Sequence, residues 1–283
     1  MPVGAPGVTT LCRKPATRET NPFIAPLSLR YDELDGQMWL DDVFVPWEHV
    51  FFVGADPDPI ARWLRWHHLY GWLAKAEFTL GLALALTDAM GLKEHEQTVE
   101  YLVDVIVEVQ TVRSCLIAAE RDPDFTEAGY CFPDHRHLAP GGIALLKARQ
   151  RISEILRILP GSSLVVAPAD SDLAAPELAA GLEESFAGGG YTALQRSALL
   201  QLAWDHVSSA LDGRESAFEL HASGGMPNWR GWLRKNFRDY NQLANAVTAM
   251  LGMPMPEIDV SNIPRAPITR RRCAAGLPPA GKN

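Results

Sequence analysis

Two patterns of apolar and polar residues divide the chain. The stretch 26–50 reads as β-structure: apolar residues alternate in part with polar ones between Met38 and Val45, and Asp41 and Asp42 indicate a turn. From about residue 59 onward, apolar residues recur at intervals of three and four, which is the spacing of an amphipathic helix. The patterns together predict a mainly α protein, a helical bundle preceded by a partial β-domain.

The helical spacing predicts five long helices and one short one. The long helices are expected over 59–90, 94–122, 141–159, 192–223 and 227–252, and the short one over 176–187. In the second helix one apolar stripe is expected, formed by Val99, Leu102, Val103, Ile106 and Val109. Residues 123–139 are expected to be irregular, and "SSLVVAP" reads as extended. The predicted units are therefore 1–56 (β), 57–253 (bundle) and 254–283 (a Pro/Arg-rich, disordered tail).

Charge and composition exclude some classes of function. The net charge is −8 and the pI is near 5.5, which disfavours nucleic acid as a partner because phosphate binding needs a basic surface. The four cysteines are scattered and show no zinc spacing, so we expect reduced thiols, no metal and a cytoplasmic location. No apolar signal segment is visible at the start, and the apolar run Phe78–Leu86 is too short to span a bilayer, so no membrane partner is expected.

Three elements are candidates for binding a large ligand. "LPGSSLVVAP" offers small residues whose backbone N–H groups could approach an anion, or it is a plain helix-ending turn. In "DGRESAFELHASGG", Arg214 pairs either with a nearby glutamate or with a phosphate. The rings at Trp63, Trp66, Tyr70 and Trp72 line a flat pocket or an oligomer interface, or they pack in the core. These residues alone do not identify a function.

Several stretches in order nevertheless resemble the 4-hydroxyphenylacetate 3-hydroxylase family, the oxygenase components of two-component flavin monooxygenases. The matching stretches are "VGAPGV", "PLSLRYDELDG", "LDDVFVPWEHVFF", "AKAEFTLGLALAL", "LPGSSLVVAPADSDL" and "LLQLAWDHVSSALDGRESAFE". The resemblance implies an acyl-CoA dehydrogenase-like fold and homo-oligomers, dimers or tetramers, formed through the bundle. It also implies FAD, reduced by a separate flavin reductase, and hydroxylation of a phenol ortho to its hydroxyl group.

The resemblance also implies roles for individual residues. Gly161, Ser162 and Ser163 correspond to an element near the flavin phosphates. Arg214 and the Gly224–Gly225 turn correspond to positions where the last helices approach the cofactor. Ser28 and Leu29 correspond to a loop that closes over the substrate, and Trp66 and Tyr70 are added as substrate contacts because of the aromatic density around them. Catalytic residues stay unassigned.

The family's N-terminal helical domain has no counterpart in residues 1–25, so we expect that it lies on a separate chain or was omitted from this sequence. Two alternatives stay open. The chain is a flavin-free cyclase or isomerase that acts on an aromatic or polyketide-like metabolite, or it is a non-catalytic oligomerising module. The related 4-hydroxybutyryl-CoA dehydratases carry an iron–sulfur cluster on ligands that include a cysteine of the first bundle helix, and residues 60–90 contain no cysteine.

Overall fold

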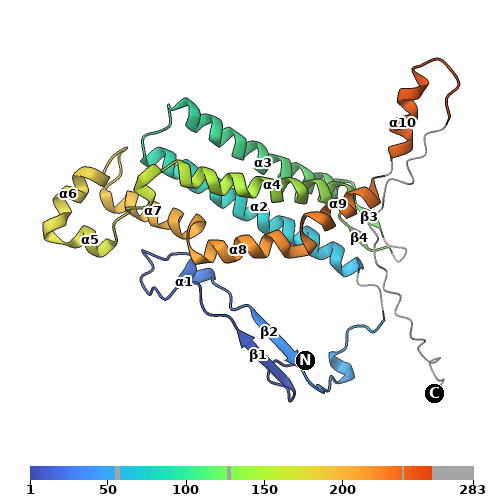
Figure 1. The fold of residues 1–283 in the computed structure, drawn as a ribbon, viewed down its shortest axis with the longest axis horizontal. Helices are drawn as coiled ribbons and strands as arrows, with labels where there is room; N and C mark the ends of the chain where they lie inside the picture. The colour runs from blue at the N-terminus through green and yellow to red at the C-terminus, as the bar shows by residue number, and fades with distance from the viewer. Residues whose placement is uncertain (55–57, 126–128, 238, 257–283) are drawn as a thin grey trace.

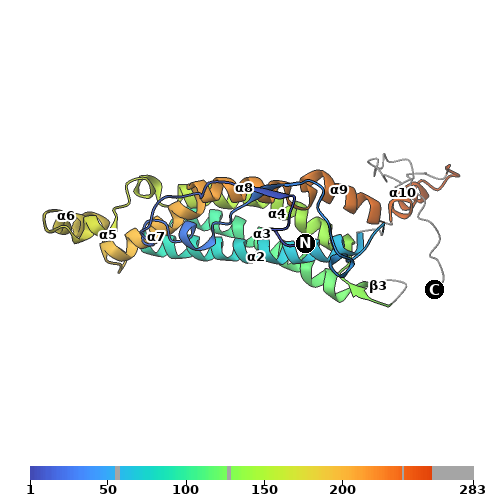
Figure 2. The same ribbon diagram turned by 90° about the horizontal axis from the view of Figure 1, so that it is seen from below.

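The computed structural model describes residues 1–54, 58–125, 129–237 and 239–256. Long helices run side by side along the molecule's long axis, and a two-stranded ribbon stands off one side of them (Figure 1). The bundle comprises α2 (Asp58–Ala89), α3 (Glu96–Arg121), α4 (His135–Ile158), α7 (Ala193–Val207), α8 (Ala210–His221) and α9 (Gly225–Asn236). Figure 2 shows that the bundle is shallow in the perpendicular view. The prediction of a mainly α fold is confirmed.

The core of the bundle lies where α2, α3 and α4 meet. Leucine, isoleucine, valine and alanine side chains that recur every three or four residues fill it, among them Leu69, Val112, Leu138 and Ile155, each fully buried. Burial of each larger aliphatic side chain contributes about 1.5–3 kcal/mol to folding. The spacing seen in the sequence is thus the spacing of the core contacts.

The apolar stripe expected on α3 is partly wrong. Leu102 and Val109 are buried, but Val99, Val103 and Ile106 are exposed, and the core positions of α3 are Val105, Val112, Leu116 and Ala119 together with the first two. The helix has apolar residues on two adjacent faces, and only one of them meets α2 and α4. Reading the sequence by periodicity merged the two faces, because both follow intervals of three and four.

Two adjacent glycines allow helices to approach α4 closely. A Cβ on Gly142 would lie 2.5 Å from the Trp229 ring, and one on Gly141 would lie 2.9 Å from the Cβ of Cys115. Trp229, on α9, is fully buried against this position. The glycines are therefore packing positions inside a helix.

The helix α4 begins earlier than expected, at His135, because the Asp134 side chain caps it by accepting from the Arg136 N–H at 2.7 Å.

Two of the expected long helices are divided. The helix expected over 192–223 is α7 and α8, and Ser209 starts the second by accepting from the N–H groups of Leu211 and Asp212. The predicted cap at Thr192 is confirmed, with a capping box to Gln195. The helix expected over 227–252 is α9 and α10 (Tyr240–Ala249), and α10 stands away from the bundle in Figure 1.

Between the long helices lie short elements. The stretch read as extended after residue 161 is instead the 3₁₀ turn η2 (Gly161–Leu164), followed by α5 (Asp170–Ala174) and by α6 (Pro176–Phe186), which confirms the short helix. The segment expected to be irregular holds β3 (Asp124–Phe125) and β4 (Cys131–Phe132). A further 3₁₀ turn, η3 (Ala222–Gly224), separates α8 from α9.

The β segment pairs with a strand near the chain start. β1 (Val8–Cys12) and β2 (Gly36–Leu40) form an antiparallel ribbon in which Val8 lies opposite Leu40. The reading of 26–50 as strands is wrong at two places: Ser28–Tyr31 is the short helix α1, and Val43–Val45 lies outside any strand, before the 3₁₀ turn η1 (Trp47–His49). Apolar side chains of the ribbon such as Leu11 and Leu40 are exposed.

One helix of the described residues, over Leu64–Ala89 of α2, is long and apolar enough to cross a membrane by length and composition. The expectation from the sequence rested on the shorter run Phe78–Leu86 and missed this. Of this apolar stretch, 39% is buried, and Leu69, Leu73 and Leu86 pack in the core. The core helix of a bundle can be as long and as apolar as a membrane-spanning helix, so these two properties of α2 do not separate the two kinds of helix. Most of the predicted tail, 257–283, lies outside the described residues.

Candidate functional site

A cavity of about 640 Å³ lies between α1, α2 and the junction of α7 with α8. Its volume falls in the range of small-molecule sites. Half of its lining residues are apolar or small, namely Leu27, Gly71, Ala74, Phe78, Leu202 and Leu211. The cavity therefore offers apolar walls of a size that accepts an aromatic ring.

The other lining residues are polar, namely Arg30, Tyr31, Lys75, His206, Asp212 and Glu215. Most of their charges are neutralised by neighbours. Lys75 Nζ lies 2.5 Å from Glu215 Oε2, and Asp212 Oδ2 lies 3.0 Å from an Arg157 nitrogen. The wall of α8 that faces the cavity is thus held by ion pairs to α2 and α4.

Asp205 fixes the start of α1 over the cavity. This α7 residue is 2% exposed, and its Oδ2 accepts from the backbone N–H groups of Leu27 and Ser28, each at 2.8 Å. Its Oδ1 accepts from the Ser28 hydroxyl at 2.5 Å. A carboxylate at this place satisfies the free N–H groups of a helix start and interacts favourably with the positive end of the helix dipole. The cap of α1 therefore comes from a distant part of the chain.

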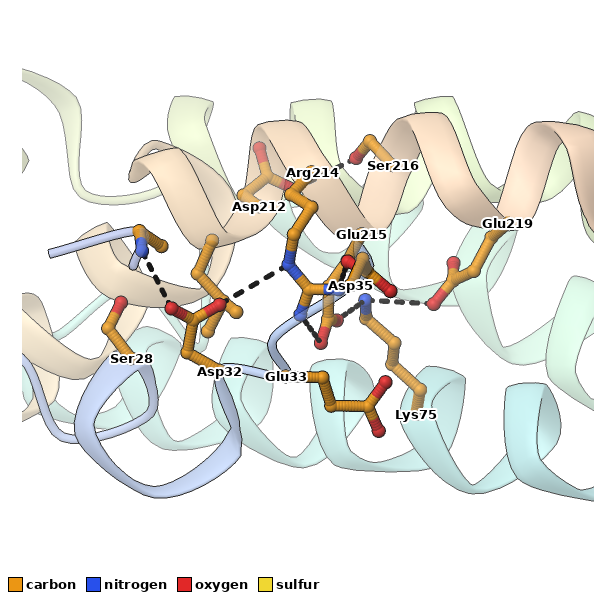
Figure 3. A network of polar contacts seen from close by, with 12 residues as sticks. Ser28, Asp32, Glu33, Asp35, Lys75, Asp212, Arg214, Glu215, Ser216 and Glu219 are labelled. Carbon is orange, nitrogen blue, oxygen red and sulfur yellow. Dashed lines mark hydrogen bonds and ion pairs between the residues drawn. The ribbon is translucent and has the colours of Figure 1, made fainter. Parts of the chain in front are cut away.

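The end of α1 is held by a second contact, the Arg214 cluster, which consists of Arg13, Asp32, Asp35 and Arg214. Figure 3 shows Arg214 reaching toward Asp32 and Asp35. Arg214 Nε lies 3.3 Å from Asp32 Oδ1, and its Nη1 donates to Asp35 Oδ2 at 3.1 Å. Arg13 pairs with the same two carboxylates and donates from Nε to Asp35 at 3.1 Å. Two guanidinium groups and two carboxylates thus balance one another.

The cluster keeps both aspartates ionised. Burial opposes ionisation of Asp32, but hydrogen bonds from Arg13 and from the Ala16 N–H outweigh it and lower the pKa of Asp32. For Asp35, the hydrogen bond from Arg13 is the main cause of a lowered pKa. The α8 residue Arg214 is therefore bound to the segment between α1 and β2 by charges that persist at neutral pH.

Glu219 on α8 completes the polar face. One of its oxygens accepts from Lys75 Nζ at 3.0 Å, and the other pairs with Arg149 of α4. Arg149 also donates to the Ser216 hydroxyl at 3.0 Å. Figure 3 shows Lys75 reaching between the side chains of Glu215 and Glu219. Residues of α2, α4 and α8 are thus tied into one polar layer beside the cavity.

His206 lies in the cavity wall as a neutral group. The Thr79 hydroxyl donates to the Lys75 carbonyl at 2.7 Å, so His206 Nε2 carries the proton and donates to Thr79 Oγ1 at 2.7 Å. Burial, with a smaller contribution from Lys75, lowers the pKa of His206 to about 4. Phe78 packs edge-on against the imidazole, with ring centroids 5.1 Å apart.

The residues predicted to contact substrate do not come together. Ser28 is buried, and its hydroxyl is bound to Asp205, while Leu29 is 42% exposed beside the cavity-lining residues of α1. Trp66 and Tyr70 instead donate to Glu120 of α3, at 2.9 and 2.7 Å, and this bond raises the pKa of Tyr70 to about 12. The side chain of Trp63 lies outside the described residues. The aromatic density of α2 thus serves contacts with α3, and Trp72 packs against the core.

The residues predicted to hold the cofactor lie at separate places. Gly161 and Ser162 are exposed and Ser163 is partly exposed, at the end of α4, and Gly161 has a φ of 56°. Gly224 and Gly225 lie between α8 and α9, where a Cβ would clash with Asn228 or with the Leu220 carbonyl. In Figure 1 these two elements lie at opposite ends of the α7–α8 pair. Glycine at 224 and 225 is thus explained by the turn itself, and Arg214 by its carboxylate partners.

Sequence reasoning missed Asp205, Lys75, Asp32 and Arg13. Three of them stand in the stretches already singled out, "AWD", "AKAEF" and "RYDE", and Arg214 and Glu219 stand in "GRESAFE". Polar residues inside otherwise apolar motifs were the available signal, but pairing across more than a hundred positions is not visible in one sequence. Among the described residues, no group of three or more His, Cys, Asp and Glu is placed to bind a metal ion.

Two family models match the chain. The model for 4-hydroxyphenylacetate 3-hydroxylase C terminal matches residues 61–252, and the model for the N terminal of the same enzyme matches residues 1–52. The chain belongs to the 4-hydroxyphenylacetate 3-hydroxylase family. The resemblance found in the short motifs is confirmed, and the gap between the matched ranges contains the predicted boundary near residue 56.

Relatives within the 4-hydroxyphenylacetate 3-hydroxylase family are monooxygenase components. The 4-nitrophenol 4-monooxygenase/4-nitrocatechol 2-monooxygenase oxygenase component of Rhodococcus opacus is 32% identical, over 77% of this chain and 43% of the relative. The 4-hydroxyphenylacetate 3-monooxygenase oxygenase component of Thermus thermophilus is 30% identical, over 77% and 47%. The chain therefore spans about half the length of the curated relatives it matches.

Solved structures agree with this assignment. A crystal structure of the oxygenase component of 4-hydroxyphenylacetate 3-monooxygenase, complexed with FAD and 4-hydroxyphenylacetate, has a TM-score of 0.82 at 27% identity and covers 89% of this chain and 54% of that one. A 4-hydroxybutyryl-CoA dehydratase from N. maritimus, at 17% identity, has a TM-score of 0.78 over 92% of this chain and 53% of that one, which is a likeness of fold alone. The predicted acyl-CoA dehydrogenase-like fold is confirmed.

Proposed function

We propose that the chain forms the C-terminal bundle of an oxygenase component that hydroxylates a phenol with FAD reduced by a separate reductase. One observation carries the proposal: residues of three family motifs, "PLSLRYDE", "AKAEF" and "GRESAFE", line one cavity, and Asp205 of a fourth, "AWD", caps the helix α1 beside it. The relatives named above are oxygenase components that act on 4-nitrophenol and on 4-hydroxyphenylacetate, and a further relative, from Burkholderia cepacia, is named an FADH₂-dependent monooxygenase. The cavity is the proposed place for the phenol ring or the flavin ring.

The chemistry of this cavity suits an aromatic ring better than a phosphate. Apolar side chains exclude water from its walls, and Phe78 and Tyr31 supply aromatic contacts. Bound reduced FAD would supply the reaction with oxygen, while the chain would hold the ring, orient it and keep water away. His206 beside it is neutral above about pH 4 and holds its proton on Nε2.

Some of the residues that were predicted to bind the FAD phosphates are free to do so, and others are not. The guanidinium of Arg214 pairs with Asp32 and Asp35, which leaves it bound to protein carboxylates. Gly224 and Gly225 serve a tight turn. Of the predicted residues, Gly161, Ser162 and Ser163 keep an open surface, and no atom lies within 4 Å of a Cβ built on Gly161. We propose that flavin phosphates bind at Ser162 and Ser163.

We further propose that hydroxylation needs the region that the relatives carry beyond the matched half, supplied on a separate chain or otherwise. The ribbon β1–β2 supports this, because a two-stranded ribbon alone is marginally stable and its Met38, Trp39 and Leu40 are 43–58% exposed.

We also propose a homo-oligomer, a dimer or a tetramer, formed through the bundle. Its contact would be the α3 stripe, which we define as the exposed residues Val99, Val103, Ile106 and Ile117 on one face of α3. An apolar row of this kind on a long helix is typical of a helix–helix interface.

The experiment is a titration of the purified chain with FAD, oxidised and then reduced, followed by the visible spectrum and flavin fluorescence. It is run alone and with the N-terminal half of the Rhodococcus opacus relative. A shifted flavin spectrum in either case supports the proposal. No flavin binding in either case contradicts it, and tight binding of an aromatic metabolite without flavin would favour the alternative of a flavin-free cyclase or isomerase. A chain that binds neither and only self-associates would be a non-catalytic oligomerising module.

A further inference from the structure

A second cavity lies deeper in the bundle than the cavity described above. Its volume is about 40 Å³, and its lining residues come from α2, α4, α7 and α8, whereas residues of α1 line the larger cavity. We call the smaller space the inner cavity and the space of about 640 Å³ the outer cavity. Lys75, His206 and Asp212 line both of them. These three side chains thus form the partition between the two cavities.

Most of the surface of the inner cavity is apolar. Its apolar lining residues belong to α2 and α4 and also pack in the core, namely Trp72, Ala76, Leu145, Leu146 and Ile152. A buried water is held by about two to four hydrogen bonds, whereas a cavity with apolar walls stays dry and takes up apolar guests such as xenon. This side of the inner cavity therefore suits an apolar guest better than water.

The charged side chains that line the inner cavity are paired and sum to zero. Lys75 Nζ donates to Glu219 Oε1 at 3.0 Å, and the other Glu219 oxygen pairs with Arg149. Asp212 Oδ2 lies 3.0 Å from an Arg157 nitrogen. Figure 3 shows Lys75 of α2 directed at Glu219 of α8. Lys75 and Arg149 are positive and Asp212 and Glu219 are negative, so this lining favours neither an anion nor a cation.

The uncharged polar side chains of the inner cavity are also bound, with one exception. His206 Nε2 donates to Thr79 Oγ1 at 2.7 Å, and the Thr79 hydroxyl donates to the Lys75 carbonyl at 2.7 Å. Ser153 is the one polar lining residue to which the described part of the chain supplies no hydrogen-bond partner. One hydroxyl does not hold a row of waters across a space of about 40 Å³. The inner cavity is therefore a small space without net charge and with few free polar groups.

We propose that the inner cavity binds dioxygen, the gas that the proposed hydroxylation consumes, next to the outer cavity where the aromatic rings are proposed to bind. This inference rests on the proposed function. Dioxygen is small, uncharged and apolar, so it moves from water into such a space without losing hydrogen bonds. The partition of Lys75, His206 and Asp212 is the short path from the inner cavity to the outer one. The bundle thus holds the gas apart from bulk water, beside the place where it reacts.

Xenon is the probe for this site, because it is apolar, uncharged and located by its anomalous scattering. Crystals of the full chain are exposed to xenon gas, and xenon should bind in the inner cavity. Leu146→Phe fills this cavity and should abolish the xenon site, whereas Ile152→Ala enlarges it and should raise the xenon occupancy. Gly181→Ala, in α6 and outside both linings, is the control and should change nothing. Opposite effects of the two variants separate a change of the cavity from a folding defect.

A second measurement connects the inner cavity to the use of oxygen. The chain is combined with the N-terminal half of the Rhodococcus opacus relative, loaded with reduced FAD and mixed with buffers of rising oxygen concentration. L146F should lower the rate constant for oxidation of the flavin by oxygen several-fold, because the gas no longer collects beside the outer cavity. The dissociation constant of FAD should stay the same in L146F, and G181A should change neither value.

The outcomes separate this inference from the proposed function. Ordered water in the inner cavity under xenon, or xenon in the outer cavity alone, would overturn the inference and leave the proposed function standing. Equal rates of flavin oxidation in L146F and in the natural chain, with the xenon site lost, would overturn it as well. If the assembly binds no flavin, the proposed function fails, and a xenon site in the inner cavity is then a packing void without a role in the use of oxygen.

Discussion

Asp205 joins two parts of the sequence that lie far apart. Its carboxylate replaces a local cap, since Leu27 at the start of α1 has no side-chain oxygen to offer. A helix of four residues does not form by itself in water, so α1 depends on this contact and on the Arg214 cluster. The sequence shows the motif "AWD" and the motif "PLS" but not that one binds the other.

Replacement of Asp205 by alanine should destabilise the chain by about 3 kcal/mol, because buried N–H and O–H donors lose a charged acceptor. Asp205→Asn keeps an acceptor and should cost less. The measurement is urea unfolding followed by circular dichroism, with Glu184→Ala, a change at an exposed residue of α6, as the control. Equal stability of D205A and the natural chain would show that α1 is held by the Arg214 cluster alone.

His206 predicts a pH dependence of stability. Its pKa is about 4 in the folded chain and 6.5 is its ordinary value, so the unfolded chain takes up a proton first as the pH falls. The contribution of this imidazole to the free energy of unfolding is fully present above pH 6.5. It is lost as the pH falls toward 4, and the total loss is about 3 kcal/mol. The free energy of unfolding measured from pH 7.5 to 4 should fall less steeply for His206→Gln. Parallel curves for the two proteins would contradict the buried neutral imidazole.

At the scale of the element, periodicity predicted where helices lie better than how they join. All six of the expected segments contain helices, because apolar patterns with clear caps such as Thr192 determine them. The divisions between α7 and α8 and between α9 and α10 were missed, since helical residues continue on both sides and only a serine cap marks the first break. The α1 helix was missed because its cap is tertiary.

Gly142 gives a direct test of helix packing. Gly142→Ala places a Cβ 2.5 Å from the Trp229 ring and should destabilise the chain by about 2 kcal/mol, because α4 and α9 must separate. Gly181→Ala is the matched control, since nothing lies within 4 Å of that position in α6, and it should stabilise by about 0.5–1 kcal/mol. Thermal unfolding measures both changes. A stabilising effect at both sites would contradict the close contact at Trp229.

At the scale of the whole molecule, two apolar surfaces stay exposed after folding, and we expect further protein to pack against them. The α3 stripe and the ribbon β1–β2 are exposed, and neither was separable from core positions by sequence pattern alone. Motif resemblance predicted the family and the fold, while the pairing of those motifs around one cavity required coordinates. The predicted substrate contacts Trp66 and Tyr70 lie at Glu120, away from that cavity.

The proposed oligomer predicts that a charge in the α3 stripe lowers the assembly state. Ile106→Glu should shift the chain toward the monomer, because it places an unpaired charge in an apolar contact. Thr111→Glu, at an exposed position of α3 outside the stripe, should leave the mass unchanged. Size-exclusion chromatography with light scattering gives the mass of each. An unchanged mass for I106E would show that the contact lies elsewhere.

The central claim is that the converging motifs form the ligand site, and hydrogen exchange with and without 4-hydroxyphenylacetate tests it most directly. The account predicts slower exchange on ligand addition for amides of α1, of residues 71–78 and of the α7–α8 junction, with no change in α6. Protection centred on Trp66, Tyr70 and the end of α3 instead, with α1 unchanged, would contradict it.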